Sequence, residues 1–226
     1  MACINKQAES RIVLAMVGLP ARGKSLISQK VVRYLLWLSI KAKCFNVGSY
    51  RREVNAHPPA EFFDALNPEG EQLRKSAAEA AVEDMLKWFK TENGVVGVLD
   101  ATNSTKERRD WILSRCNSEA LPVMFVESIC DDEAVILHNI MDVKLKSPDY
   151  EGEDPEEAVI DFRKRITNYE KVYETIDETD LTYVKLINVG TRIIISNVKD
   201  YLQSRIVYYL MNLHIKPRSI WLSRVS

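Results

Sequence analysis

One short stretch of the chain has the residue types and spacing of a phosphate-binding loop. It reads Gly18-Leu19-Pro20-Ala21-Arg22-Gly23-Lys24-Ser25 and fits G-x-x-x-x-G-K-[ST]. The glycines let backbone N–H groups converge on an anion, and the helix start that follows adds donors. Lys24 is expected to reach the β- and γ-phosphates, and the Ser25 hydroxyl to bind Mg²⁺. The order strand, loop, helix disfavours the alternative, a Gly/Pro-rich turn that only opens a helix.

A second candidate is the carboxylate of Asp100, which directly follows the apolar run Val95–Leu99. A carboxylate at the end of an apolar strand resembles a Walker B position, which holds Mg²⁺ or its water. Strands often end in Asp, but a P-loop upstream favours the functional interpretation. A kinase also needs a group that orients or deprotonates the acceptor hydroxyl. Asp100 is the best-placed carboxylate for that role too, and the residues leave the two roles open.

Several arginines indicate that the acceptor carries a phosphate. Arginine presents a rigid fork of donors that matches phosphate oxygens in pairs, and each charge-assisted bond contributes about 1.5–3 kcal/mol. Arg165 and Tyr169 are four residues apart, which places them on one helix face. Any one of these arginines taken alone is more often a solvated helix side chain than a ligand. The candidates are Arg51, Arg52, Arg74, Arg108, Arg109 and Arg165.

The remaining polar candidates each have two interpretations. Thr102 and Asn103 follow Asp100 and either bond an acceptor hydroxyl or cap the next helix. Lys144 lies in the helix after the fourth strand and is either a second phosphate ligand or a solvated lysine. Cys130, at a strand end, fits a small buried residue better than a nucleophile.

These residues need elements that bring them to one edge of a sheet. The pattern predicts strands at 12–17, 44–48, 95–99, 122–130, 183–189 and 219–223, and helices at 24–40, 68–89, 105–117, 133–143, 155–173 and 197–213. Strands alternating with crossover helices indicate a mostly parallel sheet with helices on both faces, the three-layer α/β architecture of P-loop NTPases. Ligands bind beyond the carboxyl ends of such strands, so one cleft can collect Gly18, Gly48, Asp100 and Cys130.

Length and charge exclude several classes of protein. The 226 residues fit one α/β domain, and the formal net charge of -1 argues against a general binder of nucleic acids or membrane surfaces. No apolar run approaches the ~20 residues of a membrane helix, and residues 1–11 lack the apolar core of a secretory signal. The four cysteines form no C-x-x-C pair, which favours reduced thiols. We therefore expect a cytoplasmic protein.

Longer motifs in a fixed order extend this interpretation. Besides residues 18–25 they are Phe45–Arg52, Asp100–Asn103, Glu127–Cys130, Val143–Tyr150 and Gln203–Asn212. Together they resemble the kinase half of the 6-phosphofructo-2-kinase/fructose-2,6-bisphosphatase family over nearly the whole chain. The resemblance implies ATP-dependent phosphorylation of the small-molecule substrate fructose 6-phosphate at its 2-hydroxyl. The product would be fructose 2,6-bisphosphate, a regulator of glycolysis.

The resemblance also implies roles for individual residues. ATP would bind to the loop together with Leu26 and Ile27, and to the segment from Asn139 to Lys144. Asp100 and Cys130 match positions that the family treats as active-site residues, beside Lys24. Fructose 6-phosphate would be held by Arg51, Arg74, Thr102, Arg108, Lys144, Arg165 and Tyr169.

The chain departs from the family pattern in two places. Ser25 stands where many members have Thr, which keeps the hydroxyl for Mg²⁺. The phosphatase half of the family opens with Arg-His-Gly-Glu, whereas here Trp221–Arg224 is followed by Val225 and Ser226, without a histidine. We therefore expect one kinase domain over residues 1–226, with a tail at 1–10, the start of a linker at 217–226 and no bisphosphatase activity.

Other hypotheses stay open at this point. One is a P-loop kinase for another small acceptor, and another is a nucleotide-binding module without catalysis. The sequence predicts no nucleic-acid or membrane partner and leaves a homodimer open.

Overall fold

The computed structural model describes residues 11–141, 147–188 and 190–213. Its strands are β1 Ile12–Val17, β2 Ala42–Asn46, β3 Val96–Asp100, β4 Val123–Ile129, β5 Tyr183–Ile187 and β6 Arg192–Ser196. Its helices are α1 Lys24–Trp37, α2 Val47–Val54, α3 Pro68–Thr91, α4 Lys106–Asn117, α5 Glu133–Asn139, α6 Pro155–Glu170 and α7 Tyr201–Met211. Short 3₁₀ turns occupy Ala60–Phe63 and Pro148–Tyr150.

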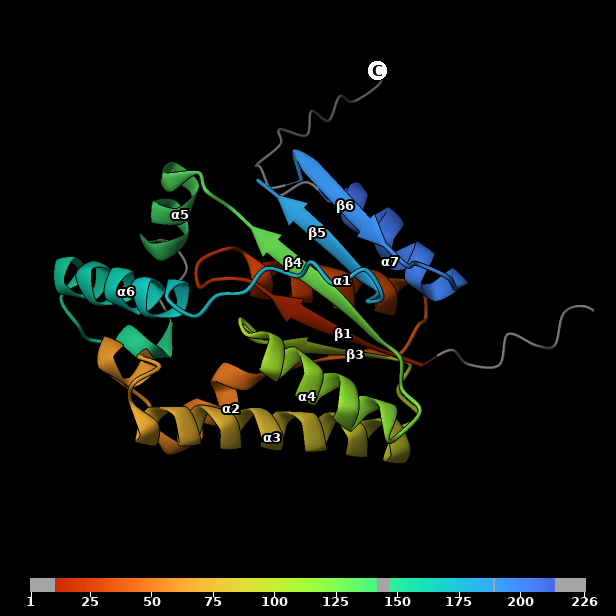
Figure 1. Cartoon of the computed structure of the whole chain (residues 1–226), viewed down its shortest axis with the longest axis horizontal. Coiled ribbons are helices and arrows are strands. Elements are labelled where there is room, and N and C mark those ends of the chain that lie inside the picture. The colour runs from red at the N-terminus through yellow and green to blue at the C-terminus, as the bar shows by residue number, and fades with distance from the viewer. Residues whose placement is uncertain (1–10, 142–146, 189, 214–226) are drawn as a thin grey trace, which may run out of the picture.

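The strands form one sheet in the order β2-β3-β1-β4-β5-β6. Every neighbouring pair is parallel except β5 and β6, which are antiparallel. Helices α1 and α7 cover one face and α3 and α4 the other, while α5 and α6 lie beyond the carboxyl ends of the strands (Figure 1). This arrangement confirms the predicted three-layer architecture with a mostly parallel sheet.

The central strand β1 explains why the sequence shows a continuous apolar run rather than an alternating one. All its residues are buried, because both faces of the sheet are covered. Ile12, Leu14 and Met16 pack with α1 and α7, whereas Val13 and its alternate neighbours pack with α3 and α4. Two apolar layers therefore hold the strand whose end opens into the P-loop.

The second strand lies two residues earlier than predicted, and this correction matters for the site. It ends at Asn46, and residues 47–54 form helix α2 instead of strand and loop. The Asn46 side chain caps this helix by accepting a hydrogen bond from the Ser49 N–H at 3.1 Å. Gly48 consequently lies in a helix, and Arg51 projects from one turn further along it.

The sequence prediction also lacks β6. The strand pairs with β5 after a turn in which Asn188 (φ 48°) and Gly190 (φ 84°) have left-handed backbones. Asn-x-Gly before an isoleucine run is a sequence signal for a hairpin at this place. The strand predicted at 219–223 lies outside the described residues. Within them, no helix has the length and apolarity needed to cross a membrane.

Candidate active site

The P-loop departs from β1 through a glycine that has no room for a side chain. Gly18 has φ 138°, and a Cβ built there would lie 2.4 Å from the backbone oxygen of Ser128 on β4. The Gly18 N–H donates to the carbonyl of Thr102 at 2.9 Å. Its amide is therefore used to join the loop to the segment after β3, and glycine is needed for the close approach to β4.

Four consecutive carbonyls of the loop accept hydrogen bonds from side chains. Lys24 Nζ donates to Leu19 O at 2.6 Å, and an Arg22 guanidinium N–H donates to Pro20 O at 3.2 Å. The next two bonds come from outside the loop. Asn139 Nδ2 donates to Ala21 O at 2.9 Å, and Ser128 Oγ donates to Arg22 O at 2.6 Å. With the carbonyls fixed in this way, the loop amides are left to face an anion.

The loop borders a cavity of about 280 Å³, which we call the P-loop cavity. Lys24 and Ser25 line one side of it, and Asp100 at the end of β3 lines another. Asp100 is buried, and its Oδ2 accepts a hydrogen bond from Asn46 Nδ2 at 2.6 Å. The two residues are register partners on β2 and β3, so the sheet itself orients this carboxylate. Sequence reasoning gave Asn46 no role.

A second cavity of about 320 Å³, the arginine cavity, lies between α2, α3, α4 and α6. All the predicted acceptor-binding residues within the described part of the chain line it; Lys144 lies outside that part. They are Arg51, Arg74, Thr102, Arg108, Arg165 and Tyr169. Four guanidinium groups from four helices therefore converge on one space. Their roles as ligands stay a prediction.

The two cavities share a wall, so a ligand in one lies beside a ligand in the other. The residues that line both are Gly48, Arg51, Ala101, Thr102 and Arg165. This shared wall has the layout that transfer between two phosphorylated molecules requires, with the phosphate cradle on one side and a cluster of cations on the other.

The arginines are held in place before any ligand arrives. Arg165 stacks on Phe63, with its guanidinium carbon 3.7 Å from the ring centroid. Arg74 donates to the carbonyls of Phe62 and Asp64, and Arg51 donates to Asn55 O at 3.0 Å. Burial lowers the pKa of Arg51 and of Arg108, but a guanidinium stays protonated in proteins.

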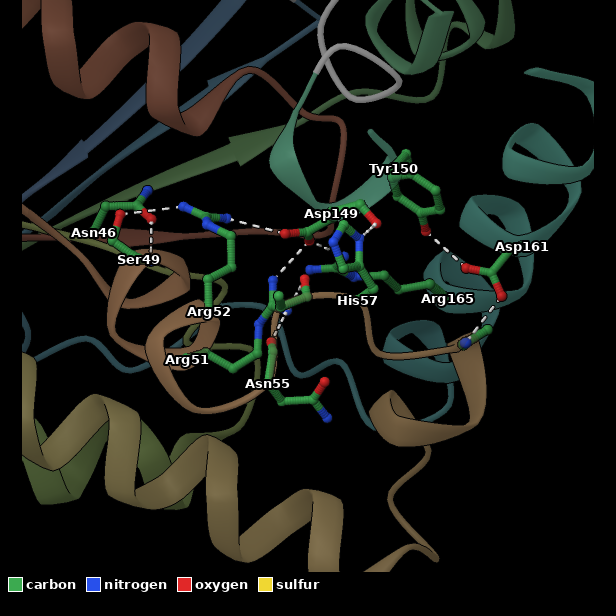
Figure 2. Close-up of polar contacts among 12 residues, drawn as sticks. Asn46, Ser49, Arg51, Arg52, Asn55, His57, Asp149, Tyr150, Asp161 and Arg165 are labelled. Carbon is green, nitrogen blue, oxygen red and sulfur yellow. Dashed lines mark hydrogen bonds and ion pairs between the residues drawn. The ribbon is translucent and has the colours of Figure 1, made fainter. Parts of the chain in front are cut away.

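Asp149 is a second site residue, beside Asn46, that sequence reasoning missed. It lies in the 3₁₀ turn Pro148–Tyr150, and Figure 2 shows its carboxylate among the side chains of Arg51, Arg52 and Arg165. Burial alone would raise the pKa of Asp149. The Arg51 hydrogen bond and the charges of Arg165 and Arg51 outweigh it and lower the pKa to about 2. Asp149 is therefore ionised at neutral pH.

Other predicted residues lie elsewhere. Arg109 points away from both cavities: it is 1% exposed, donates to Glu174 O at 2.8 Å and lies 3.5 Å from a Glu178 oxygen. The helix-capping alternative for Thr102 and Asn103 is wrong, because Thr105 caps α4. Asn103 instead ties its loop to Met16 O at 2.8 Å. Thr102 lines both cavities, where its hydroxyl can reach an acceptor.

Cys130 is not in the cavity that holds Lys24 and Asp100. It is buried and borders a small pocket of about 50 Å³ between α1, α5 and the end of β4. Ile27 and Asn139 line the same pocket. Gly18 and Leu19 line neither large cavity; they shape the loop instead.

A profile of the 6-phosphofructo-2-kinase family matches residues 1–217. The chain belongs to this family. It is 47% identical over 226 residues to the fructose-2,6-bisphosphatase of Saccharomyces cerevisiae, covering 98% of the chain and 50% of the relative. It is 46% identical over 228 residues to 6-phosphofructo-2-kinase/fructose-2,6-bisphosphatase 3 of Homo sapiens, covering 99% of the chain and 44% of the relative. The chain thus spans about half the length of these relatives.

Solved structures support the fold of this family member. The APS kinase CysC of Mycobacterium tuberculosis aligns with a TM-score of 0.53 at 15% identity, over 90% of this chain and 99% of that one. Kti12 of Chaetomium thermophilum aligns with a TM-score of 0.54 at 16% identity, over 87% and 95%. At such low identity the likeness is one of fold alone.

The donor set fits Mg²⁺ better than a metal held by protein ligands alone. Within the described residues there is no group of three or more His, Cys, Asp or Glu side chains that could hold a metal. Ser25 and Asp100 offer oxygen ligands at the P-loop cavity. Mg²⁺ binds in this way, through one or two protein oxygens together with substrate phosphates and waters.

Proposed function

We propose that this chain is an ATP-dependent kinase that phosphorylates fructose 6-phosphate at its 2-hydroxyl and releases fructose 2,6-bisphosphate and ADP. The observation that carries the proposal is the shared wall between the P-loop cavity and the arginine cavity. Membership of the 6-phosphofructo-2-kinase family supplies the substrate and the position of transfer. We also propose that the reaction takes place in the cytoplasm, in keeping with four cysteines that form no C-x-x-C pair.

On the donor side, the loop amides and Lys24 hold the triphosphate. Lys24 is buried at the first turn of α1, where its charge can stabilise the phosphoryl oxygens as negative charge spreads over them. Ser25 and Asp100 would supply oxygen ligands to Mg²⁺, which would neutralise part of the phosphate charge when bound. The small pocket beside Asn139 and Cys130 lies next to the loop and contributes to the nucleotide side.

On the acceptor side, the arginines bind the 6-phosphate and so fix the position of the sugar. Arg74 and Arg108 lie at the far side of the arginine cavity, whereas Arg165 and Thr102 reach the shared wall. A sugar whose 6-phosphate is bound by these arginines can direct its 2-hydroxyl toward the P-loop cavity. Such positioning can contribute about 7–11 kcal/mol when both reactants are held in a near-attack geometry.

Transfer is direct and in line, without a covalent enzyme intermediate. The 2-hydroxyl oxygen forms a bond to the γ-phosphorus while the bond to the ADP oxygen breaks, and the hydroxyl proton leaves. Asp100, held by Asn46, has the position to accept that proton or to bind Mg²⁺. Cys130 lies in another pocket, and we give it no part in the transfer.

A second candidate is a nucleotide-binding module without kinase activity. One observation favours it: the relative from Saccharomyces cerevisiae carries the name of the phosphatase alone. Against it stand Lys24, Ser25 and Asp100, together on one cavity with the arginines beside it.

A coupled ADP-release assay decides between the candidates. The chain is mixed with ATP and Mg²⁺, first alone and then with fructose 6-phosphate, fructose or another sugar phosphate. Our proposal expects ADP only with fructose 6-phosphate, together with an acid-labile product at the 2-position. ATP binding without ADP release from any acceptor would support the silent module.

A further inference from the structure

One buried carboxylate organises three arginines from two helices. Asp149 Oδ2 lies 2.7 Å from Arg51 Nη2 and 2.9 Å from Arg165 Nη1, and its Oδ1 lies 3.2 Å from Arg52 Nη1. The Asp149 side chain is 8% exposed. These contacts connect α2 to α6 through the 3₁₀ turn, over separations of up to 98 residues (Figure 2).

The two oxygens of Asp149 serve different parts of the site. Oδ2 holds Arg51 and Arg165, which line both cavities and form the cationic part of their shared wall. Oδ1 holds Arg52, which lines the P-loop cavity and also donates to Ser49 Oγ at 3.1 Å. The carboxylate therefore sits where the donor side and the acceptor side meet.

The arginines need this counter-charge to stay together. Arg51 is 5% exposed and Arg165 is 16% exposed, so the repulsion between them is poorly screened by solvent. Each guanidinium has five N–H donors, and the contacts to Asp149 use one from each arginine. Arg165 Nε is buried and has no hydrogen-bond partner. The arginines thus keep further donors for a ligand.

The charge of the cluster also suits the ligand. Three guanidinium groups and one carboxylate give a net charge of +2. A phosphate monoester is a dianion above its second pKa, about 6, so its charge balances that of the cluster.

The backbone of Asp149 is fixed as well, since its carbonyl oxygen lies 3.2 Å from His57 Nδ1. The neighbouring Tyr150 hydroxyl donates to Asp161 Oδ2 at 2.7 Å.

We propose that Asp149 is the positioning residue for the acceptor phosphate: its carboxylate fixes Arg51 and Arg165 at the shared wall in the geometry that a phosphate dianion takes up. It touches the arginines and acts through them. The inference rests on the proposed function, because it deepens the role of the acceptor site. The opposite role, a carboxylate that competes with the phosphate for the arginines, predicts an effect of opposite sign.

The test compares Asp149→Asn with wild type in binding and in turnover. Isothermal titration with fructose 6-phosphate, and separately with inorganic phosphate, is done at saturating Mg-ADP so that the P-loop is occupied. We expect Asp149→Asn to weaken both anions at least tenfold and to raise the KM for fructose 6-phosphate similarly. The KM for ATP should change less than about twofold. Glu83→Gln removes the charge of an exposed carboxylate that pairs with Arg115, and it should change none of these values.

Asp149→Glu covers the case in which the Asn variant does not fold. It restores a carboxylate but moves it by one methylene, so anion affinity should lie between wild type and Asp149→Asn. A folded Asp149→Glu with wild-type affinity, or a folded Asp149→Asn with unchanged or tighter anion binding, would overturn the inference. The binding measurement needs no turnover. A wild-type protein that binds phosphate but releases no ADP would refute the proposed function. The titrations would still decide the role of Asp149.

Discussion

Replacing Gly18 by alanine tests whether the approach of the P-loop to β4 is as close as the structure has it. The new Cβ would lie 2.4 Å from Ser128 O, a backbone atom in the sheet that cannot swing away as a side chain can. The backbone angle, φ 138°, is also one that L-residues rarely adopt. Strain in such a conformation costs about 1–3 kcal/mol, and overpacking of a tight site about 1–3 kcal/mol more.

Gly23 provides a matched control in the same loop. It also has a positive φ, 77°, but a Cβ built there meets no atom within 4 Å. Gly23→Ala should therefore carry the conformational cost alone, about 1–2 kcal/mol. The two variants differ by the contact with β4, about 1–3 kcal/mol, which corresponds to roughly 2–12 °C in Tm for a domain of this size.

Thermal unfolding followed by circular dichroism measures this difference, with both variants in the same buffer and without nucleotide. Gly18→Ala should melt lower than Gly23→Ala. It should also disturb the acceptor side, because the Gly18 N–H is bonded to the carbonyl of Thr102. Equal Tm values for the two variants would show that the loop does not press against Ser128 and would refute the close approach of Gly18 to β4.

Three further predictions follow from the charges of the site. Lys24→Ala should lower kcat by at least about a hundredfold with the fold intact, because the phosphoryl oxygens lose a buried positive charge beside them. The ADP-release assay measures this loss. Near wild-type turnover would contradict the P-loop role of Lys24. Arg74→Ala should raise the KM for fructose 6-phosphate about 10–150-fold and the KM for ATP far less; equal changes would place Arg74 outside the acceptor pocket. The pKa of Asp149 is about 2 in the folded protein, against 3.8 for the unpaired carboxyl group. Asp149 therefore contributes about 2 kcal/mol to the free energy of unfolding above about pH 5. This contribution is lost as the pH falls from about 4 to about 2. Acid unfolding of Asp149→Asn should lack this component, and parallel wild-type and variant curves would contradict it.

The parts of the fold that the sequence predicts well are those that depend on local patterns. The P-loop motif, the buried run of β1 and the Pro68–Thr91 helix each have their signal within a few neighbouring residues. The sequence does not predict helix α2, because Cys-Phe-Asn-Val-Gly at residues 44–48 resembles a strand. The cap at Asn46 ends that strand two residues earlier than predicted. Hydrophobic pattern alone cannot distinguish a short strand from a capped helix start.

The Asp149 cluster is beyond the reach of such patterns. Asp in a Pro-Asp turn is an ordinary turn residue, and nothing near it in the sequence indicates that it is buried. Two of its partners lie 97 and 98 residues earlier in the chain. Only the fold, which places α2, the Pro148–Tyr150 turn and α6 around one carboxylate, brings them together. A sequence can therefore indicate a phosphate pocket from its arginines without revealing the carboxylate that arranges them.

Two adjacent arginines show the same limit on a smaller scale. Arg108 and Arg109 share one helix and one residue type, yet successive residues on a helix point in directions about 100° apart. Arg108 faces the arginine cavity, while Arg109 is buried against the segment after α6, where it bonds Glu174 and Glu178. That segment follows directly from the helix carrying Arg165 and Tyr169. One arginine thus lines the pocket, and the other holds the chain that supports the opposite wall.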